Sequence, residues 1–206
     1  MPIVTHQDEY LLSKIEVELA NMINSLAREI DSIKNQEKKL GDMYQAYTKD
    51  LGKYIRKMRD KSKQMDVLAR EDKSGISKTE VDAYKKQVQK VDDRIRMIEG
   101  YYDRLKDLAL QKNNLTKRMK EYASLMVSHA KIRNNIVDIG LKIEKEKNKM
   151  VAAESISRNE DKLKDAEREF ERSKKELNKK WAQLEEERAE VNQMWRALKN
   201  SIDDFE

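Results

Sequence analysis

Few residues in this 206-residue chain belong to types that could carry out catalysis. His6 and His129 are its only histidines, and they lie far apart in the sequence. Adjacent carboxylates such as Asp92 and Asp93 fall in helical sequence, where neighbouring side chains point in different directions. There is no cysteine, no glycine-rich phosphate loop and no metal-binding spacing. We therefore predict no enzyme, and we expect no catalytic residue, cofactor or metal site.

Lysine and arginine do gather in groups that could bind a charged partner. One group surrounds the second predicted turn: Lys142, Lys145, Lys147, Lys149, Arg158, Lys162 and Lys164. Another lies near the middle of the chain: Lys112, Lys117, Arg118 and Lys120. A third, within residues 53–63, lies before the first predicted turn. Each group is either a solvated face that keeps the chain soluble or a contact with anionic lipid, at about 1 kcal/mol per cation near the surface.

The elements that position these groups are predicted to be helices. Apolar residues recur every three or four positions, charged residues make up 40% of the chain, and only six residues are Gly or Pro. Helices are predicted over about 6–69, 78–153 and 157–205. In the first helix the apolar stripe begins with Leu12, Ile15, Leu19, Met22 and Leu26, and such a stripe must pack against other helices. We predict an all-α fold of three long, kinked, antiparallel helices in one domain, 1–206.

Two turns separate the predicted helices. Residues 71–76 contain Gly75, and Ser77 with Glu80 then has the form of a capping box. Residues 153–156 form the second turn, and Ser157 with Glu160 repeats the capping-box pattern. Turns this short force successive helices to run antiparallel.

The third helix is the shortest, which leaves one end of the first two helices uncovered. Tyrosines gather in this region, and a second copy of the chain is the simplest partner to cover them. Alternatively, these tyrosines fill the core of a monomer and keep their hydroxyls in water. The predicted dimer interface consists of Tyr44, Tyr47, Leu51, Tyr54, Met58, Tyr84, Tyr101, Tyr102, Trp195, Leu198 and Phe205.

Two stretches resemble the BAR domain family. Residues 160–167, EDKLKDAE, continuing to 180–184, KWAQL, are similar to the third helix of BAR domains in sorting nexins and Chibby-interacting BAR proteins. Residues 46–49, AYTK, with the basic run up to Lys61, resemble the first helix of the Chibby-interacting group. The resemblance implies a curved six-helix dimer, either a homodimer or a heterodimer with a related BAR chain.

That resemblance also implies a function. BAR dimers sense or scaffold curved anionic membranes during trafficking and endocytosis, through basic residues at their distal tips and concave face. The group around the second turn would then form a tip, and the mid-chain group would line the concave face. We accordingly expect a cytoplasmic chain that lies on membrane surfaces without crossing them.

Three other functions are alternatives to this one. A coiled-coil adaptor or tether would bind helical partners without direct membrane contact. An ESCRT-III-like filament subunit tends to be basic in front and acidic behind, whereas each third of this chain mixes both charges. Nucleic-acid binding is disfavoured because the aromatic residues lie in the apolar stripes and not among the basic groups.

Overall fold

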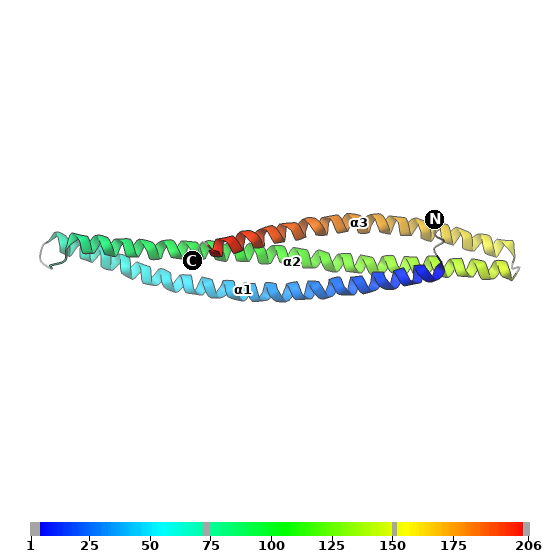
Figure 1. Ribbon diagram of the computed structural model, residues 1–206, viewed down its shortest axis with the longest axis horizontal. Helices are drawn as coiled ribbons and strands as arrows, with labels where there is room; N and C mark the ends of the chain where they lie inside the picture. Colours follow the sequence, from blue (N-terminus) through cyan, green and yellow to red (C-terminus); the bar gives the residue numbers. More distant parts are fainter. Residues whose placement is uncertain (1–4, 72–74, 150–151, 204–206) are drawn as a thin grey trace. The chain divides into compact units, whose positions relative to one another are not determined.

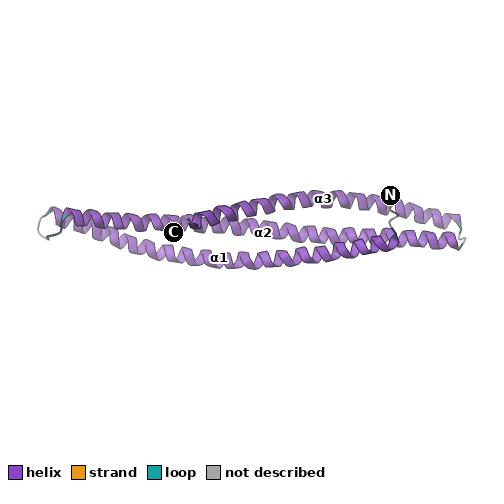
Figure 2. Ribbon diagram, viewed as in Figure 1, coloured by secondary structure: helices purple, strands orange, loops and turns teal. Residues whose placement is uncertain are grey.

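The fold consists of three long helices. The computed structural model describes residues 5–71, 75–149 and 152–203, which contain no strand. Helix α1 spans His6–Arg70, α2 spans Lys78–Asn148 and α3 spans Ala153–Asp203 (Figures 1 and 2). The all-α prediction with three long helices is confirmed, and α3 is the shortest, with 51 residues against 65 and 71.

The chain divides into two compact units, and unit 1 comprises Met1–Ser32 and Gln111–Val191. In this unit the start of α1, the second half of α2 and most of α3 pack together. Asp31 of α1 pairs with Lys120 of α2, whereas Glu16 pairs with Arg133, so these two helices run antiparallel. Helices α2 and α3 also run antiparallel, because Lys147 pairs with Glu160 and Tyr122 contacts Trp181.

Unit 2 comprises Ile33–Leu110 and Asn192–Glu206. Here α1 and α2 again run antiparallel, since Tyr44 contacts Tyr101 and Asp66 pairs with Lys85. The last described turns of α3 belong to this unit, where Leu198 is 1% exposed. Whether residues 1–206 form a single domain stays a prediction.

Small residues form the buried face of α1. They recur every seven residues, which places them on one side of the helix. The buried small residues are Ser13, Ala20 and Ala27 in unit 1, and Gly41, Thr48 and Ser62 in unit 2; two positions of the row carry larger side chains, the half-buried Lys34 and the buried Ile55. At Gly41 a methyl group would lie 3.2 Å from the ring of Tyr102, so the glycine gives this ring room against the backbone. Small side chains at these positions let α1 approach its neighbours closely.

The first predicted capping box is confirmed. The backbone N–H of Ser77 donates to a Glu80 carboxylate oxygen at 2.8 Å, and the backbone N–H of Glu80 donates to Ser77 Oγ at 3.2 Å. Gly75 precedes it with φ of 66°, a left-handed conformation that glycine adopts without strain.

The second predicted capping box is wrong. Helix α2 ends at Asn148 rather than near 153, and α3 already begins at Ala153, so Ser157 and Glu160 lie inside α3. The Glu160 carboxylate pairs instead with Lys147 of α2 at 2.9 Å, across the connection. The connection is therefore several residues earlier than the capping pattern predicts.

Candidate functional site

Large apolar side chains form an exposed row along α1, which we call the outer seam. They recur every seven residues: Leu12, Leu19 and Leu26 in unit 1, and Ile33, Leu40, Tyr47 and Tyr54 in unit 2. Each of them exposes between 40% and 57% of its surface. Ile15, Met22 and Met43, also exposed, lie three residues further along and widen the same face.

The outer seam lies beside the buried small-residue face, one position earlier in each heptad. Ala20 packs with Ala123 and Met126 of α2, whereas the adjacent Leu19 is exposed and directed away from this core. Helices that pack along one another carry apolar residues at two positions of each heptad, and here the second position is apolar only at Ile15, Met22 and Met43. Exposed apolar surface of this extent marks an interaction site in proteins.

The residues predicted for a dimer interface have different surroundings in unit 2. Tyr44 and Tyr101 pack edge-to-face, with ring centroids 5.5 Å apart, and Leu198 is buried inside the unit. Four others are half-buried: Leu51, Met58, Tyr84 and Tyr102. Tyr47, Tyr54 and Trp195 are exposed. Phe205 lies outside the described residues. An interface outside the protomer could therefore use only part of this set without repacking.

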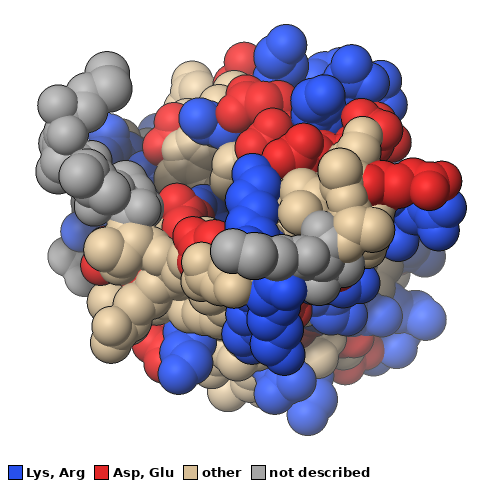
Figure 3. Space-filling view, turned by 90° about the vertical axis from the view of Figure 1, so that its right-hand side faces the viewer, with Lys and Arg blue, Asp and Glu red and all other residues tan. Residues whose placement is uncertain are grey.

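The basic group at the α2–α3 connection is only partly neutralised. Lys147 pairs with Glu160 at 2.9 Å, and Lys164 pairs with Asp161 at 3.6 Å. The hydrogen bond from Lys147 holds the pKa of the Glu160 carboxyl below its ordinary value. The other five cations are exposed and form no ion pair with the described residues: Lys142, Lys145, Lys149, Arg158 and Lys162. Figure 3 views this end and shows Lys and Arg side chains around it, interspersed with Asp and Glu.

Cations of the mid-chain group are largely engaged within unit 1. Arg118 pairs with Glu187 of α3 and also donates to the side-chain oxygen of Gln183 at 3.4 Å. Lys120 pairs with Asp31 of α1 at 2.8 Å. Lys112 is half-buried and Lys117 is exposed. Three helices are linked by these pairs, so the group has less charge to offer an external partner than the sequence suggests.

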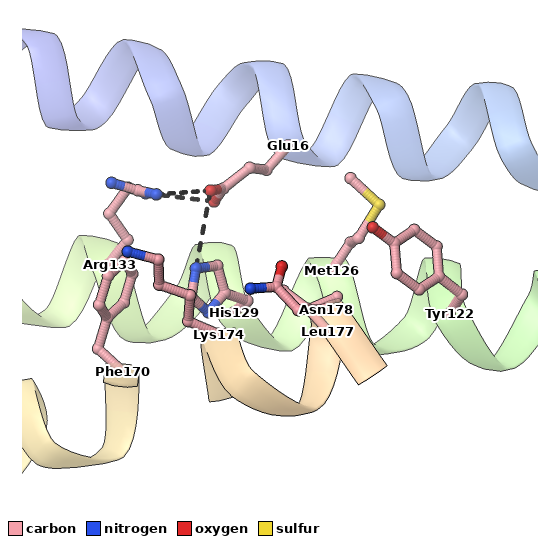
Figure 4. A pocket seen from close by; sticks show the side chains of 9 residues that line it. All are labelled: Glu16, Tyr122, Met126, His129, Arg133, Phe170, Lys174, Leu177 and Asn178. Carbon is pink, nitrogen blue, oxygen red and sulfur yellow. Dashed lines mark hydrogen bonds and ion pairs between the residues drawn. The ribbon is translucent and has the colours of Figure 1, made fainter. Parts of the chain in front are cut away.

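A polar cluster lies between the three helices of unit 1, beside a pocket of about 360 Å³ (Figure 4). His129 of α2 is 4% exposed, and its Nδ1 lies 3.0 Å from Ser173 Oγ of α3. Its ring stacks on Phe170 at 4.3 Å between centroids, and its Nε2 faces Glu16 of α1 at 3.9 Å. Arg133 donates to the Glu16 carboxylate at 2.7 and 3.3 Å.

Serine, histidine and glutamate are also the residue types of a hydrolase triad, but the geometry here favours a structural role. The 3.9 Å between Glu16 and His129 is too long for a hydrogen bond, and the carboxylate is already held by Arg133. Ser173 is buried within a continuous helix, whose backbone N–H groups are engaged and cannot stabilise an oxyanion. The cluster thus holds three helices in register. The sequence alone gave no sign that His129 and Ser173 would meet.

Neither a metal-binding cluster nor a membrane-spanning stretch is found in residues 5–71, 75–149 and 152–203. No group of three or more His, Asp or Glu side chains there is arranged to hold a metal ion. None of the helices has a stretch long and apolar enough to cross a membrane.

Comparison of the chain with protein-family models, curated proteins and solved structures found no match in any of the three. Its kinship with BAR domains accordingly stays a prediction.

Proposed function

We propose that the chain is a self-associating helical module that binds anionic membrane surfaces through the cations beside the α2–α3 connection. The observation that supports this most directly is the set of five exposed cations there that have no acidic partner among the described residues. Two nearby acids are already engaged, Glu144 with His6 at 3.1 Å and Asp161 with Lys164. Anionic lipid is a ligand that suits such a surface.

The strength of membrane binding would depend on the number of cations near the surface and on avidity. A lysine or arginine near an anionic membrane contributes about 1 kcal/mol, so five from one chain give weak and reversible binding. Two copies held together would present two such surfaces and bind far more tightly, provided that both reach the membrane. A dimer of the BAR kind would also select membranes by curvature, at the cytoplasmic face and in trafficking.

Liposome co-sedimentation tests the proposal. The variant carries Lys142→Glu, Lys145→Glu and Lys149→Glu, and we expect it to lose binding to phosphatidylserine-containing vesicles. The matched control carries Arg172→Glu, Lys175→Glu and Lys179→Glu, which changes the charge equally on exposed positions of α3. These positions are interspersed with Glu169, Glu171 and Glu176, so their local potential is not strongly positive.

Two outcomes would contradict membrane binding. One is that the wild-type chain fails to sediment with phosphatidylserine-containing vesicles at low salt. The other is that the variant and the control lose binding equally, which would indicate a response to net charge alone. Binding by the wild type should also weaken as salt rises, because exposed charges are screened within about 8–10 Å at moderate ionic strength.

A coiled-coil adaptor that does not contact membranes is the second candidate. The outer seam of α1 favours it, because a heptad row of exposed apolar residues suits a helical partner. A chain that binds no vesicle but captures another helix through Leu19 and Leu40 would support this alternative. The two functions are therefore distinguished by which substitutions abolish binding, those of cations or those of seam residues.

A further inference from the structure

We infer that the pocket between the three helices of unit 1 binds a small aliphatic carboxylate, whose anionic group lies on Lys174 and Asn178 of α3. The pocket has a volume of about 360 Å³, and all of the residues that line it belong to unit 1 (Figure 4). This volume lies at the small end of the range of about 300–1,000 Å³ in which proteins bind small molecules. The inference depends neither on membrane binding nor on self-association.

Two helices supply nearly all of the lining. From α2 come four side chains spaced by three or four residues, which places them on one face of the helix: Tyr122, Met126, His129 and Arg133. From α3 come four more: Phe170, Lys174, Leu177 and Asn178. Helix α1 contributes only Glu16. The pocket is therefore formed mainly between α2 and α3, with α1 along one side.

The polar groups that remain free in this lining suit an anion. Its one carboxylate, that of Glu16, accepts hydrogen bonds from Arg133 at 2.7 and 3.3 Å, and Arg133 is also paired with Glu9. Lys174 is exposed and forms no ion pair with the described residues, and the Asn178 side chain has no hydrogen-bond partner among them. A carboxylate that reaches both side chains would accept a charge-assisted hydrogen bond from the lysine and a second one from the amide.

The apolar part of the lining suits an alkyl chain better than an aromatic ring. Met126 belongs to the core cluster of unit 1, and Leu177 packs against that cluster. The ring of Phe170 already stacks on His129 and lies 4.8 Å from the Arg133 guanidinium, so an aromatic ligand would have to displace these contacts. Methionine is flexible and fills irregular gaps, so it can adapt to an alkyl chain without such a displacement.

Calorimetric titration of the full chain with octanoate tests the class of ligand. Acetate carries the same charge without the chain, and 1-octanol has the same chain length without the charge. We expect octanoate to bind, and both comparison molecules to bind at least about tenfold more weakly, because each lacks one of the two kinds of contact. Trp181 lies beside the pocket, with its ring centroid 5.4 Å from that of Tyr122. Octanoate should therefore change the fluorescence of a Trp195→Phe chain, in which Trp181 is the only tryptophan.

Two matched variants test the position of the anionic group. Lys174→Gln should weaken octanoate binding about tenfold, because it removes the charged donor. Lys175→Gln removes the same charge from the next residue, which is exposed and does not line the pocket, and should leave the affinity unchanged. Both side chains are exposed, so both variants should keep the helicity of the wild type in circular dichroism.

Three results would overturn the inference. One is that octanoate does not bind at millimolar concentration. Another is that 1-octanol binds as tightly as octanoate, which would show an apolar surface without a site for the anion. The third is an equal loss of affinity in Lys174→Gln and Lys175→Gln, which would show a response to net charge rather than to the pocket.

Discussion

Leu19 and Ala20 are neighbours on α1, yet the alanine is fully buried while the leucine exposes 44% of its surface. The same relationship recurs one heptad later, where Ala27 is buried and Leu26 is half exposed. At these two places α1 uses the small side chain for contact inside the protomer and directs the large one outward. This inversion is hard to explain for a helix that has no further partner.

Enlarging Ala20 should therefore destabilise unit 1. Ala20 packs with Ala123 and Met126 in a core cluster, and a leucine there would overpack it. We expect Ala20→Leu to cost about 1–3 kcal/mol in the free energy of unfolding. Urea unfolding followed by circular dichroism measures this cost. The control is Ala46→Leu at an exposed position of the same helix, and equal stability of the two variants would contradict the packing described here.

Leu108 and Leu110 of α2 offer a second matched pair. Leu108 is fully buried in unit 2, whereas Leu110 exposes 60% of its surface. Leu108→Ala should lower the free energy of unfolding by about 2–5 kcal/mol, because it leaves a cavity. Leu110→Ala removes the same atoms from a mostly solvated position and should cost much less. Thermal and urea unfolding of both variants measure these losses. A larger loss for Leu110→Ala than for Leu108→Ala would contradict the core assignment.

Serines at the two capping patterns should respond differently to alanine. Ser77 caps α2, so Ser77→Ala should destabilise the chain by about 0.5–2 kcal/mol. Ser157 lies inside α3, where alanine is the better helix former, so Ser157→Ala should be neutral or slightly stabilising. Unfolding curves of the two variants decide the matter. A similar loss in both would mean that α3 begins at the later residue after all.

Acidification should weaken the three-helix junction through His129. Burial lowers the pKa of His129 below its ordinary value of 6.5; the Arg133 and Lys174 cations act in the same direction, while Glu16 and Glu171 oppose them. The unfolded chain therefore binds this proton more readily than the folded chain. The stability that neutral His129 contributes to the folded chain is therefore present above about pH 6.5 and is lost as the pH falls below this value.

The measurement is the free energy of unfolding at about pH 7.5 and about pH 5.5, for the wild type and for His129→Gln. The wild type should lose stability on acidification, and the variant should lose less. The control is His6→Gln, which replaces the other histidine of the chain, 3.1 Å from Glu144. An identical pH response in the wild type and His129→Gln would exclude His129 as the responsible group.

The sequence predicts the buried residues of α2 better than those of α1. Three-to-four-residue periodicity predicts the three helices well, and in α2 the periodic residues Val81, Val88 and Ile95 are the buried ones. In α1 the same reasoning points to Leu12 and Leu19, which are exposed. Periodicity identifies residues that share a face, but which face packs inward depends on how closely the neighbouring helix approaches, and here the small residues allow the closer approach.

The candidate site residues were also predictable only in part. The basic residues were found from their grouping, but only the structure shows that Arg118 and Lys120 are engaged by Glu187 and Asp31. Such pairs depend on the register between helices. That register also depends on where the α2–α3 connection begins, which the second capping pattern placed too late. Contacts such as that of His129 with Ser173 follow from this register and were not predictable from spacing alone.

Sedimentation equilibrium of the unmodified chain tests the central claim, self-association of the chain, most directly. At micromolar concentration we predict a species of twice the 24.4 kDa chain mass. A single species of 24.4 kDa at every concentration tested would contradict the account.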